Sequence, residues 1–207
     1  MNSPDTLKNS SLDDLDPDGG VLSLTFFWRS RPEDPFPDFP GEKLSTQIYI
    51  PTQAEDRCPC GSGKHFAACC QLLPYWRPVC PNPDLQGYSL LRSQSALFTD
   101  IPDNEVYAFL EDDEHLHCVD DTPQEAMWLY WGNPAFESST LGIYCFGDFA
   151  LKKDHTLMIT ALSDIRMQVL LDLLHPLELG APRMEKEPFP RLEKPARQSP
   201  QSKRHRR

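Results

Sequence analysis

Residues 58–70 read CPCGSGKHFAACC and place four cysteines within a short span of the chain. The spacing is Cys-x-Cys, eight intervening residues, and then an adjacent Cys-Cys pair. Four thiolates can surround one zinc ion as a tetrahedron if the intervening chain turns back, and Gly61 and Gly63 supply the backbone freedom for that turn. Four sulfurs leave no open coordination position. The pattern therefore predicts a structural zinc site with the ligands Cys58, Cys60, Cys69 and Cys70.

This stretch has two alternative interpretations, which are metal-free thiols and a phosphate-binding loop. Tight cysteine pairs also occur in redox motifs and in flexible loops, so metal-free thiols are the alternative to a zinc site. The GSGK string at residues 61–64 is not a phosphate-binding loop, because Cys58 and His65 occupy the positions where that motif needs Gly and Ser or Thr. Cys80 is expected to be an ordinary thiol, since the set of four ligands is already complete.

The same residues resemble the SEC-C motif, a small zinc-binding segment found at the C-terminus of the SecA translocation ATPase and in many uncharacterised bacterial proteins. Residues 61–64 are similar to its turn, and Phe66 stands at its aromatic position. The resemblance implies that the motif's four ligand positions are filled by Cys58, Cys60, Cys69 and Cys70. It also implies a knuckle that contacts a protein partner through the edge formed by Lys64, His65 and Phe66.

The rest of the chain has an ordinary globular composition, with 207 residues of which 39% are hydrophobic and 25% charged. Proline is unusually frequent at 21 residues, which predicts long irregular segments. No apolar run approaches the roughly 18 residues that a transmembrane helix needs, and residues 1–20 are acidic and polar without the apolar stretch of a signal peptide. We therefore expect a soluble, cytoplasmic protein. Its seven cysteines, an odd number, cannot all pair within one chain.

Charge is unevenly distributed along the chain. Residues 182–207 carry nine Lys or Arg against three Glu, whereas the whole chain has a formal net charge of −11. An acidic body is a poor nucleic-acid binder, so only the basic tail, which contains KRHRR at residues 203–207, could contact phosphates. A nucleic-acid or ribosome-associated protein using this tail is the alternative function, and a merely solvating tail is the simpler interpretation. Both 1–20 and 182–207 are expected to be disordered.

The N-terminal region, residues 21–57, predicts two strands at 21–28 and 43–50. A proline-rich stretch separates them, so they can pair only through a long connection. Residues 51–84 contain too few apolar side chains for a core of their own. A bound metal is therefore expected to fix this part of the chain.

Residues 84–176 predict an α+β layer. Residues 106–110 and 115–119 flank the acidic turn EDDE and indicate an antiparallel hairpin. The sequence Thr-Pro-Gln-Glu that follows matches a capping box, which predicts a helix over residues 123–131. That helix would carry a cluster of bulky side chains, expected to be core rather than a partner anchor: Met127, Trp128, Tyr130 and Trp131.

Three further strands are predicted at 141–146, 149–151 and 156–162. Ser163 is a natural N-cap for a helix over 164–174, whose apolar stripe would pack on the sheet: Ile165, Val169, Leu170, Leu173 and Leu174. The predicted fold class is therefore α+β, with an antiparallel β-meander carrying one amphipathic helix beside the four-cysteine zinc knuckle and disordered termini.

Other candidate sites are weaker. His115 and His117 alternate onto one strand face beside carboxylates, but a solvated turn is the better interpretation of this acidic stretch. Cys118 and Cys145 are expected to be small buried side chains. The sequence contains no G-x-S-x-G, H-E-x-x-H or dinucleotide fingerprint, so an enzyme is not expected. The sequence therefore favours a zinc-binding, non-enzymatic protein whose knuckle acts as a structural or protein-interaction module.

Overall fold

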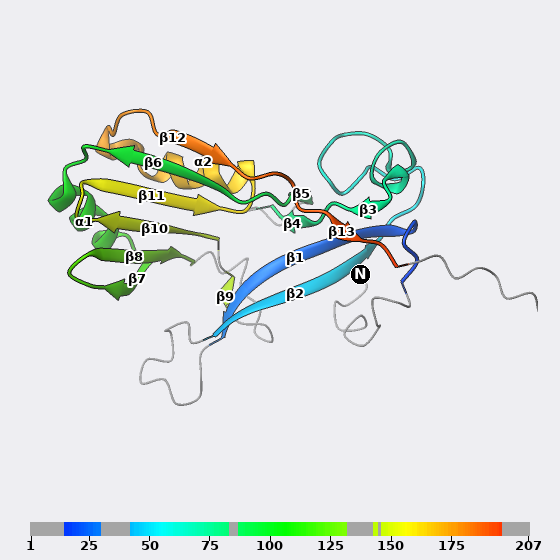
Figure 1. Cartoon of the computed structure of the whole chain (residues 1–207), viewed down its shortest axis with the longest axis horizontal. Coiled ribbons are helices and arrows are strands. Elements are labelled where there is room, and N and C mark those ends of the chain that lie inside the picture. Colours follow the sequence, from blue (N-terminus) through cyan, green and yellow to red (C-terminus); the bar gives the residue numbers. More distant parts are fainter. Residues whose placement is uncertain (1–14, 30–41, 83–86, 132–142, 145, 196–207) are drawn as a thin grey trace, which may run out of the picture.

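The computed structural model describes residues 15–29, 42–82, 87–131, 143–144 and 146–195. These residues form a mixed α and β fold with few helices and several largely antiparallel sheets (Figure 1). The six-stranded sheet lies at one end of the long axis of the molecule and the cysteine-bearing loop at the other. Nowhere in the described part is there a helix with the length and apolar character that crossing a membrane requires.

The first sheet has five strands in the order β2-β1-β4-β5, with β9 paired to the far end of β1. The two strands predicted in the N-terminal region pair with each other, because β1 and β2 run antiparallel in unbroken register along ten residues each. The other strands are short, and β4 joins β1 through one parallel pair. The bounds are β1 Gly20–Arg29, β2 Glu42–Pro51, β4 Val79–Pro81, β5 Tyr88–Leu90 and β9 Ile143–Tyr144.

The second sheet has six strands in the order β12-β6-β11-β10-β8-β7. Burial alternates along β11, where Leu157, Ile159 and Ala161 face the core, as expected for a sheet covered on one face. Helix α2 lies against this sheet (Figure 1). The bounds are β6 Gln94–Thr99, β7 Leu116–Asp121, β8 Glu125–Tyr130, β10 Gly147–Lys152, β11 Thr156–Ala161 and β12 Arg183–Lys186.

Helix α2 (Asp164–Leu173) begins where the sequence predicts. Ser163 is extended and its hydroxyl accepts a hydrogen bond from the Arg166 backbone N–H, which satisfies one donor of the first turn. Of the predicted stripe, Leu170 and Leu174 are buried, whereas Ile165 is 45% exposed. Arg166 and Met167, which lie outside that stripe, are also buried, so the buried side of the helix extends beyond the predicted one.

The predicted helix over residues 123–131 is wrong. Thr122 and Glu125 instead close a tight turn between β7 and β8, and the Thr122 hydroxyl accepts from the Glu125 N–H at 3.2 Å. The residues that match a capping box therefore stabilise a hairpin. Strand β8, which begins at Glu125, pairs with β10 along its whole length, and Trp128 within it is completely buried. Sheet pairing and burial override the local preference for a helix.

The predicted strand at residues 106–110 is also wrong, because this stretch belongs to helix α1 (Asp103–Asp112). Val106 and Leu110 are both buried and lie one helical turn apart, which is the spacing of a helix face. Asp103 and Glu105 fall in the first turn, where negative charge favours a helix. The predicted strand at 149–151 is present but longer, because β10 already begins at residue 147.

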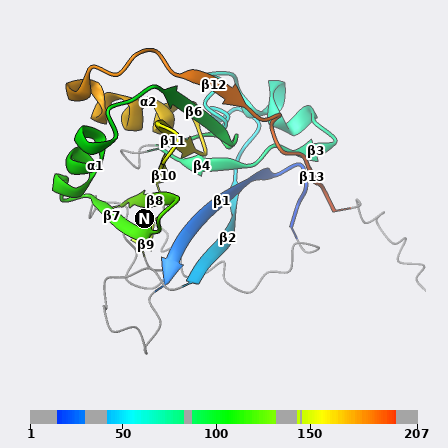
Figure 2. The same ribbon diagram turned by 60° about the vertical axis from the view of Figure 1, so that its left-hand side comes forward.

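The segment of residues 183–195, here called the C-terminal arm, differs from the expectation of a disordered tail. Its first part is β12, which adds to the edge of β6. Its second part contains β13 (Leu192–Glu193), which pairs with β3 (Tyr75–Trp76) next to the cysteine-bearing loop. Figures 1 and 2 show the arm running from the six-stranded sheet to this loop. The expectations for residues 1–14 and 196–207, KRHRR included, lie outside the described residues.

Two sets of contacts join the arm and the sheets. Asp164 at the start of α2 accepts hydrogen bonds from Arg92 at 2.8 Å and from Lys186 of β12 at 2.6 Å. Arg166 is completely buried and donates to the Pro81 carbonyl of β4 at 2.7 Å, so helix α2 is hydrogen-bonded to the first sheet. Burial lowers the pKa of Arg166, an effect that the neighbouring Cys80 opposes.

Candidate metal centre

The first cysteine pair lies on a tight turn that backbone hydrogen bonds close. The Cys58 N–H donates to the Lys64 carbonyl at 2.8 Å, and the Gly61 N–H donates to the Cys58 carbonyl at 3.3 Å. Gly61 and Gly63 have φ angles of 76° and 73°, a left-handed conformation that side chains with a Cβ rarely adopt. A Cβ on Gly61 would also come 3.3 Å from the Tyr88 carbonyl oxygen of β5. The glycines predicted to turn the chain are therefore required there.

The second cysteine pair lies where two short 3-10 helices meet, η3 (Phe66–Ala68) and η4 (Cys70–Leu72), with Cys69 between them and Cys70 at the start of η4. Cys69 joins them with φ −136° and ψ −111°, so the backbone changes direction between the two neighbouring cysteines. Hydrogen bonds fix the entry to this part, since the Phe66 N–H donates to the Asp56 carbonyl at 2.8 Å. The loop thus brings both adjacent thiols back to the first pair.

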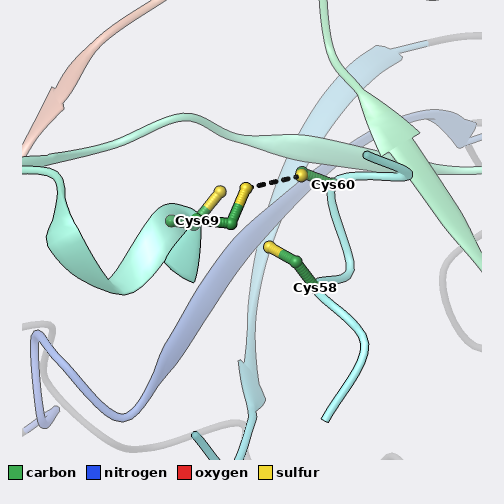
Figure 3. A group of neighbouring side chains, drawn as sticks. Cys58, Cys60 and Cys69 are labelled. Atoms are coloured by element: carbon green, nitrogen blue, oxygen red, sulfur yellow. Dashed lines mark hydrogen bonds between the residues drawn. The ribbon is translucent and has the colours of Figure 1, made fainter. Parts of the chain in front are cut away.

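All four sulfur atoms lie within 4.8 Å of one another. Figure 3 shows the side chains of Cys58, Cys60 and Cys69 converging, and the sulfurs of Cys60 and Cys69 are 3.5 Å apart. A tetrahedral zinc site with bonds of about 2.3 Å places its sulfurs about 3.8 Å from one another. The cluster therefore has the size and the donor set of a site for a metal ion that prefers four thiolates.

The cysteine cluster is packed against the first sheet. Cys58, Cys60 and Cys70 are each 4% exposed and share a small core with Val21 of β1 and Val79 of β4. Phe66, expected at the partner-contact edge, is instead completely buried in this core. An aromatic ring there fills space beneath the turn, so its place in the motif reflects packing. Lys64 and His65, the other two residues of that edge, are exposed.

The thiols are close enough to control one another's protonation. Hydrogen bonds from Cys58 and then Cys70 lower the pKa of Cys60, because they stabilise its thiolate. The pKa of Cys70 is raised, first by the hydrogen bond with Cys58, next by the one with Cys60, and then by burial. Without a cation, Cys60 therefore favours its thiolate while Cys70 keeps its proton. A divalent metal would supply the missing charge and displace the remaining protons.

Two side chains outside the set of four contact its sulfurs. The Ser62 hydroxyl is 3.2 Å from Cys69 Sγ. The Nη2 atom of Arg77 is 3.8 Å from Cys70 Sγ and 4.0 Å from Cys69 Sγ. Sequence reasoning missed Arg77, because it lies in a proline-rich segment and a basic residue there has no spacing that relates it to a metal site.

Two other cysteines that the structure describes, Cys80 and Cys118, do not join the cluster. Cys80 is completely buried and stands 3.8 Å from the Leu162 carbonyl, so the prediction that it is no ligand of this group agrees with its position. Cys118 was expected to be buried, but it is exposed on β7. The side chain occupies the solvent face of an edge strand, which strand alternation alone could not assign. Cys145 lies outside the described residues.

The two histidines of the acidic stretch are engaged with aromatic rings. The His117 ring is stacked on Trp131, with the ring centres 4.1 Å apart. The His115 ring meets Tyr130 edge to face at 6.2 Å. Within the described residues, the only group of metal-ligating side chains that converges is the four-cysteine cluster.

Comparison with known proteins identifies one short motif in this chain. Residues 56–72 match the SEC-C motif, the metal-binding segment that includes all four cysteines of the cluster. Neither a curated protein nor a solved structure matches the chain. The metal-binding assignment therefore rests on this match and on the geometry of the cluster.

Proposed function

We propose that this chain is a zinc-binding, non-enzymatic protein in which the knuckle, residues 58–70, is a structural module held by one zinc ion. The observation that carries the proposal is the convergence of four cysteine sulfurs within 4.8 Å. Cys58, Cys60, Cys69 and Cys70 would hold the ion. When bound, zinc would supply a fixed positive centre to which the two ends of the loop are attached.

The chemistry of the donor set favours a structural role over a catalytic one. Catalytic zinc needs an open coordination position for water or substrate, and four thiolates fill a tetrahedral shell. The loop has little apolar material of its own, since Phe66 is its one completely buried large side chain. A closed metal shell would thus replace the hydrophobic core that the loop lacks.

The knuckle is also our proposed contact for a protein partner, through the exposed side chains of Lys64 and His65. The His65 ring is oriented by a contact of 2.6 Å between its Nδ1 and the Glu55 carbonyl oxygen. Because Phe66 is completely buried beneath the turn, it has no part in this contact. Zinc would position the edge by fixing the turn that carries it.

Replacement of both Cys69 and Cys70 by Ser tests the proposal. We expect the reduced wild-type protein to contain one zinc per chain by metal mass spectrometry, and the double variant to contain none. A cross-linker placed at residue 64 should report a partner in the zinc-loaded protein and lose it in the variant. Cys80→Ser is the control, since that thiol is buried outside the cluster and its loss should leave zinc bound. Wild-type protein that holds no zinc when reduced would overturn the proposal.

A further inference from the structure

We propose that Arg77 is an outer-sphere partner of the metal centre, whose guanidinium holds the thiolates of Cys69 and Cys70 and slows the loss of the ion. The inference rests on the zinc function proposed above and deepens it. Arg77 lies outside residues 56–72, so the SEC-C match does not include it. Its role follows from where this chain's fold places it.

The contact geometry supports this role. One nitrogen, Nη2, lies 3.8 Å from Cys70 Sγ and 4.0 Å from Cys69 Sγ, which is within the range of N–H···S contacts. It therefore bridges the two adjacent sulfurs of the second pair. Ser62 approaches Cys69 at 3.2 Å from the other end of the loop. The sulfurs of Cys69 and Cys70 are thus contacted by polar side chains that are not metal ligands.

The backbone on both sides of Arg77 is anchored, so the guanidinium is held in place. Trp76 precedes it in β3 and is 3% exposed, and β3 is paired to the C-terminal arm. Val79 follows in β4 and is completely buried. The Nε atom of Arg77 is itself buried and has no hydrogen-bond partner among the described residues. The Arg77 side chain as a whole is half-buried, and this partial withdrawal from water strengthens its interaction with nearby negative charge.

The positive charge of Arg77 would stabilise a metal site formed by four thiolates. One divalent ion with four thiolates carries a net charge of −2, and a guanidinium beside two of the sulfurs offsets half of it. In the part of the chain that the structure describes, Arg77 is the one cationic side chain in contact with these sulfurs. Outer partners that hold metal ligands typically contribute 10-fold to 100-fold to metal affinity.

Arg57 provides a matched control within the same loop. It is next to Cys58 in sequence, yet it is exposed and makes no contact with a sulfur among the described residues. Replacing Arg57 or Arg77 by Gln removes the same charge close to the knuckle. A difference between the two variants therefore measures the contact at the second cysteine pair and not the net charge of the loop.

The experiment follows zinc transfer from the full-length, zinc-loaded chain to an excess of a chromophoric chelator. Arg77→Gln should release zinc at least about tenfold faster than wild type, and Arg77→Lys should fall between them because it keeps charge without the planar fork. Arg57→Gln should stay within about twofold of wild type. Equal release from wild type and Arg77→Gln, or an equal acceleration in Arg57→Gln, would overturn the inference.

A second measurement separates this inference from misfolding and from the proposed function. The unfolding temperature of the six-stranded sheet, followed through buried Trp128, should be the same in all four proteins. A drop confined to Arg77→Gln and Arg77→Lys would contradict a role limited to the metal. If wild-type protein holds no zinc, both the proposed function and this inference fail. If wild type holds zinc and Arg77→Gln releases it no faster, this inference alone fails.

Discussion

The six-stranded sheet and the knuckle are stabilised in different ways. The sheet buries Trp128, Phe149, Leu157 and Ile159 completely, together with Leu170 of α2. The knuckle buries Phe66 and three of its cysteines, leaves Cys69 half-buried, and exposes most of its other residues. Burial of apolar surface contributes roughly 25 cal/mol per Å², so the sheet can stand on its own core. In the proposed function, by contrast, the knuckle relies on a metal ion and on its packing against β1 and β4 of the five-stranded sheet.

The largest expected effects come from replacing two completely buried phenylalanines, one in the six-stranded sheet and one in the knuckle. Phe149→Ala in β10 should destabilise the protein by about 3–5 kcal/mol, because it leaves a cavity in the main core. Phe66→Ala should weaken zinc retention strongly and lower the unfolding free energy of the sheet much less. Denaturant unfolding and metal content measured on both variants check this pair. Loss of zinc in Phe149→Ala at temperatures where it remains folded would contradict the separation.

A substitution at the junction tests how firmly the two regions are coupled. Arg166→Met keeps the bulk of the side chain but removes the hydrogen bond to the Pro81 carbonyl. We expect the unfolding free energy to fall by about 1–3 kcal/mol. The unfolding temperatures of the six-stranded sheet and of the loop region should also move further apart. Arg183→Met is the control, since that arginine is exposed on β12. Calorimetry that shows the same single transition for both variants would argue against coupling through Arg166.

The smallest expected effect concerns pH and the C-terminal arm. The pKa of Asp164 is lowered, first by the hydrogen bond from Lys186, and Arg92 adds to this effect against burial, which raises it. A lowered carboxyl pKa contributes stability above the ordinary value of 3.8, and this stability is lost as the pH falls through the folded pKa. Since Asp164 is largely exposed, the contribution should be below about 1 kcal/mol.

Hydrogen exchange of the β12 amides checks this pH dependence. Protection in wild type should fall on acidification below pH 3.8, whereas Asp164→Asn should already have the lower protection at neutral pH. Equal protection of wild type and Asp164→Asn at neutral pH would show that the ion pairs do not hold the arm. The knuckle should be unaffected at neutral pH in either case, which sharpens the distinction between the two regions.

Several parts of this fold could be predicted from sequence because local chemistry and tertiary structure agree there. Ser163 caps α2, and the apolar alternation of β11 matches its buried face. The convergence of the four cysteines could also be predicted, since the spacing and the glycines at 61 and 63 fix a compact turn. These features depend on contacts within a few residues or on one metal-ligand pattern.

The failures have a common physical cause, which is pairing with distant residues. Residues 125–130 have a helix-start signal before them, yet β10 supplies a complete set of strand partners. Phe66 was expected at an exposed edge of the motif, but it is buried in a core with residues of β1 and β4. Arg183–Lys186 has a tail-like composition, and only the free edge of β6 makes it a strand. No local pattern contains these partners, so local reasoning could not find them.

The C-terminal arm has a consequence for the order of events during synthesis. The edge of β6 receives β12, and β3 receives β13, only from residues near the end of the described chain. The cysteines of the knuckle are made far earlier, and chains fold progressively as they leave the ribosome. In the proposed function, zinc can therefore bind before β12 and β13 are in place. The loop can pack on β1 and β4 at that stage, and β13 adds its pairing with β3 only after translation has passed residue 193.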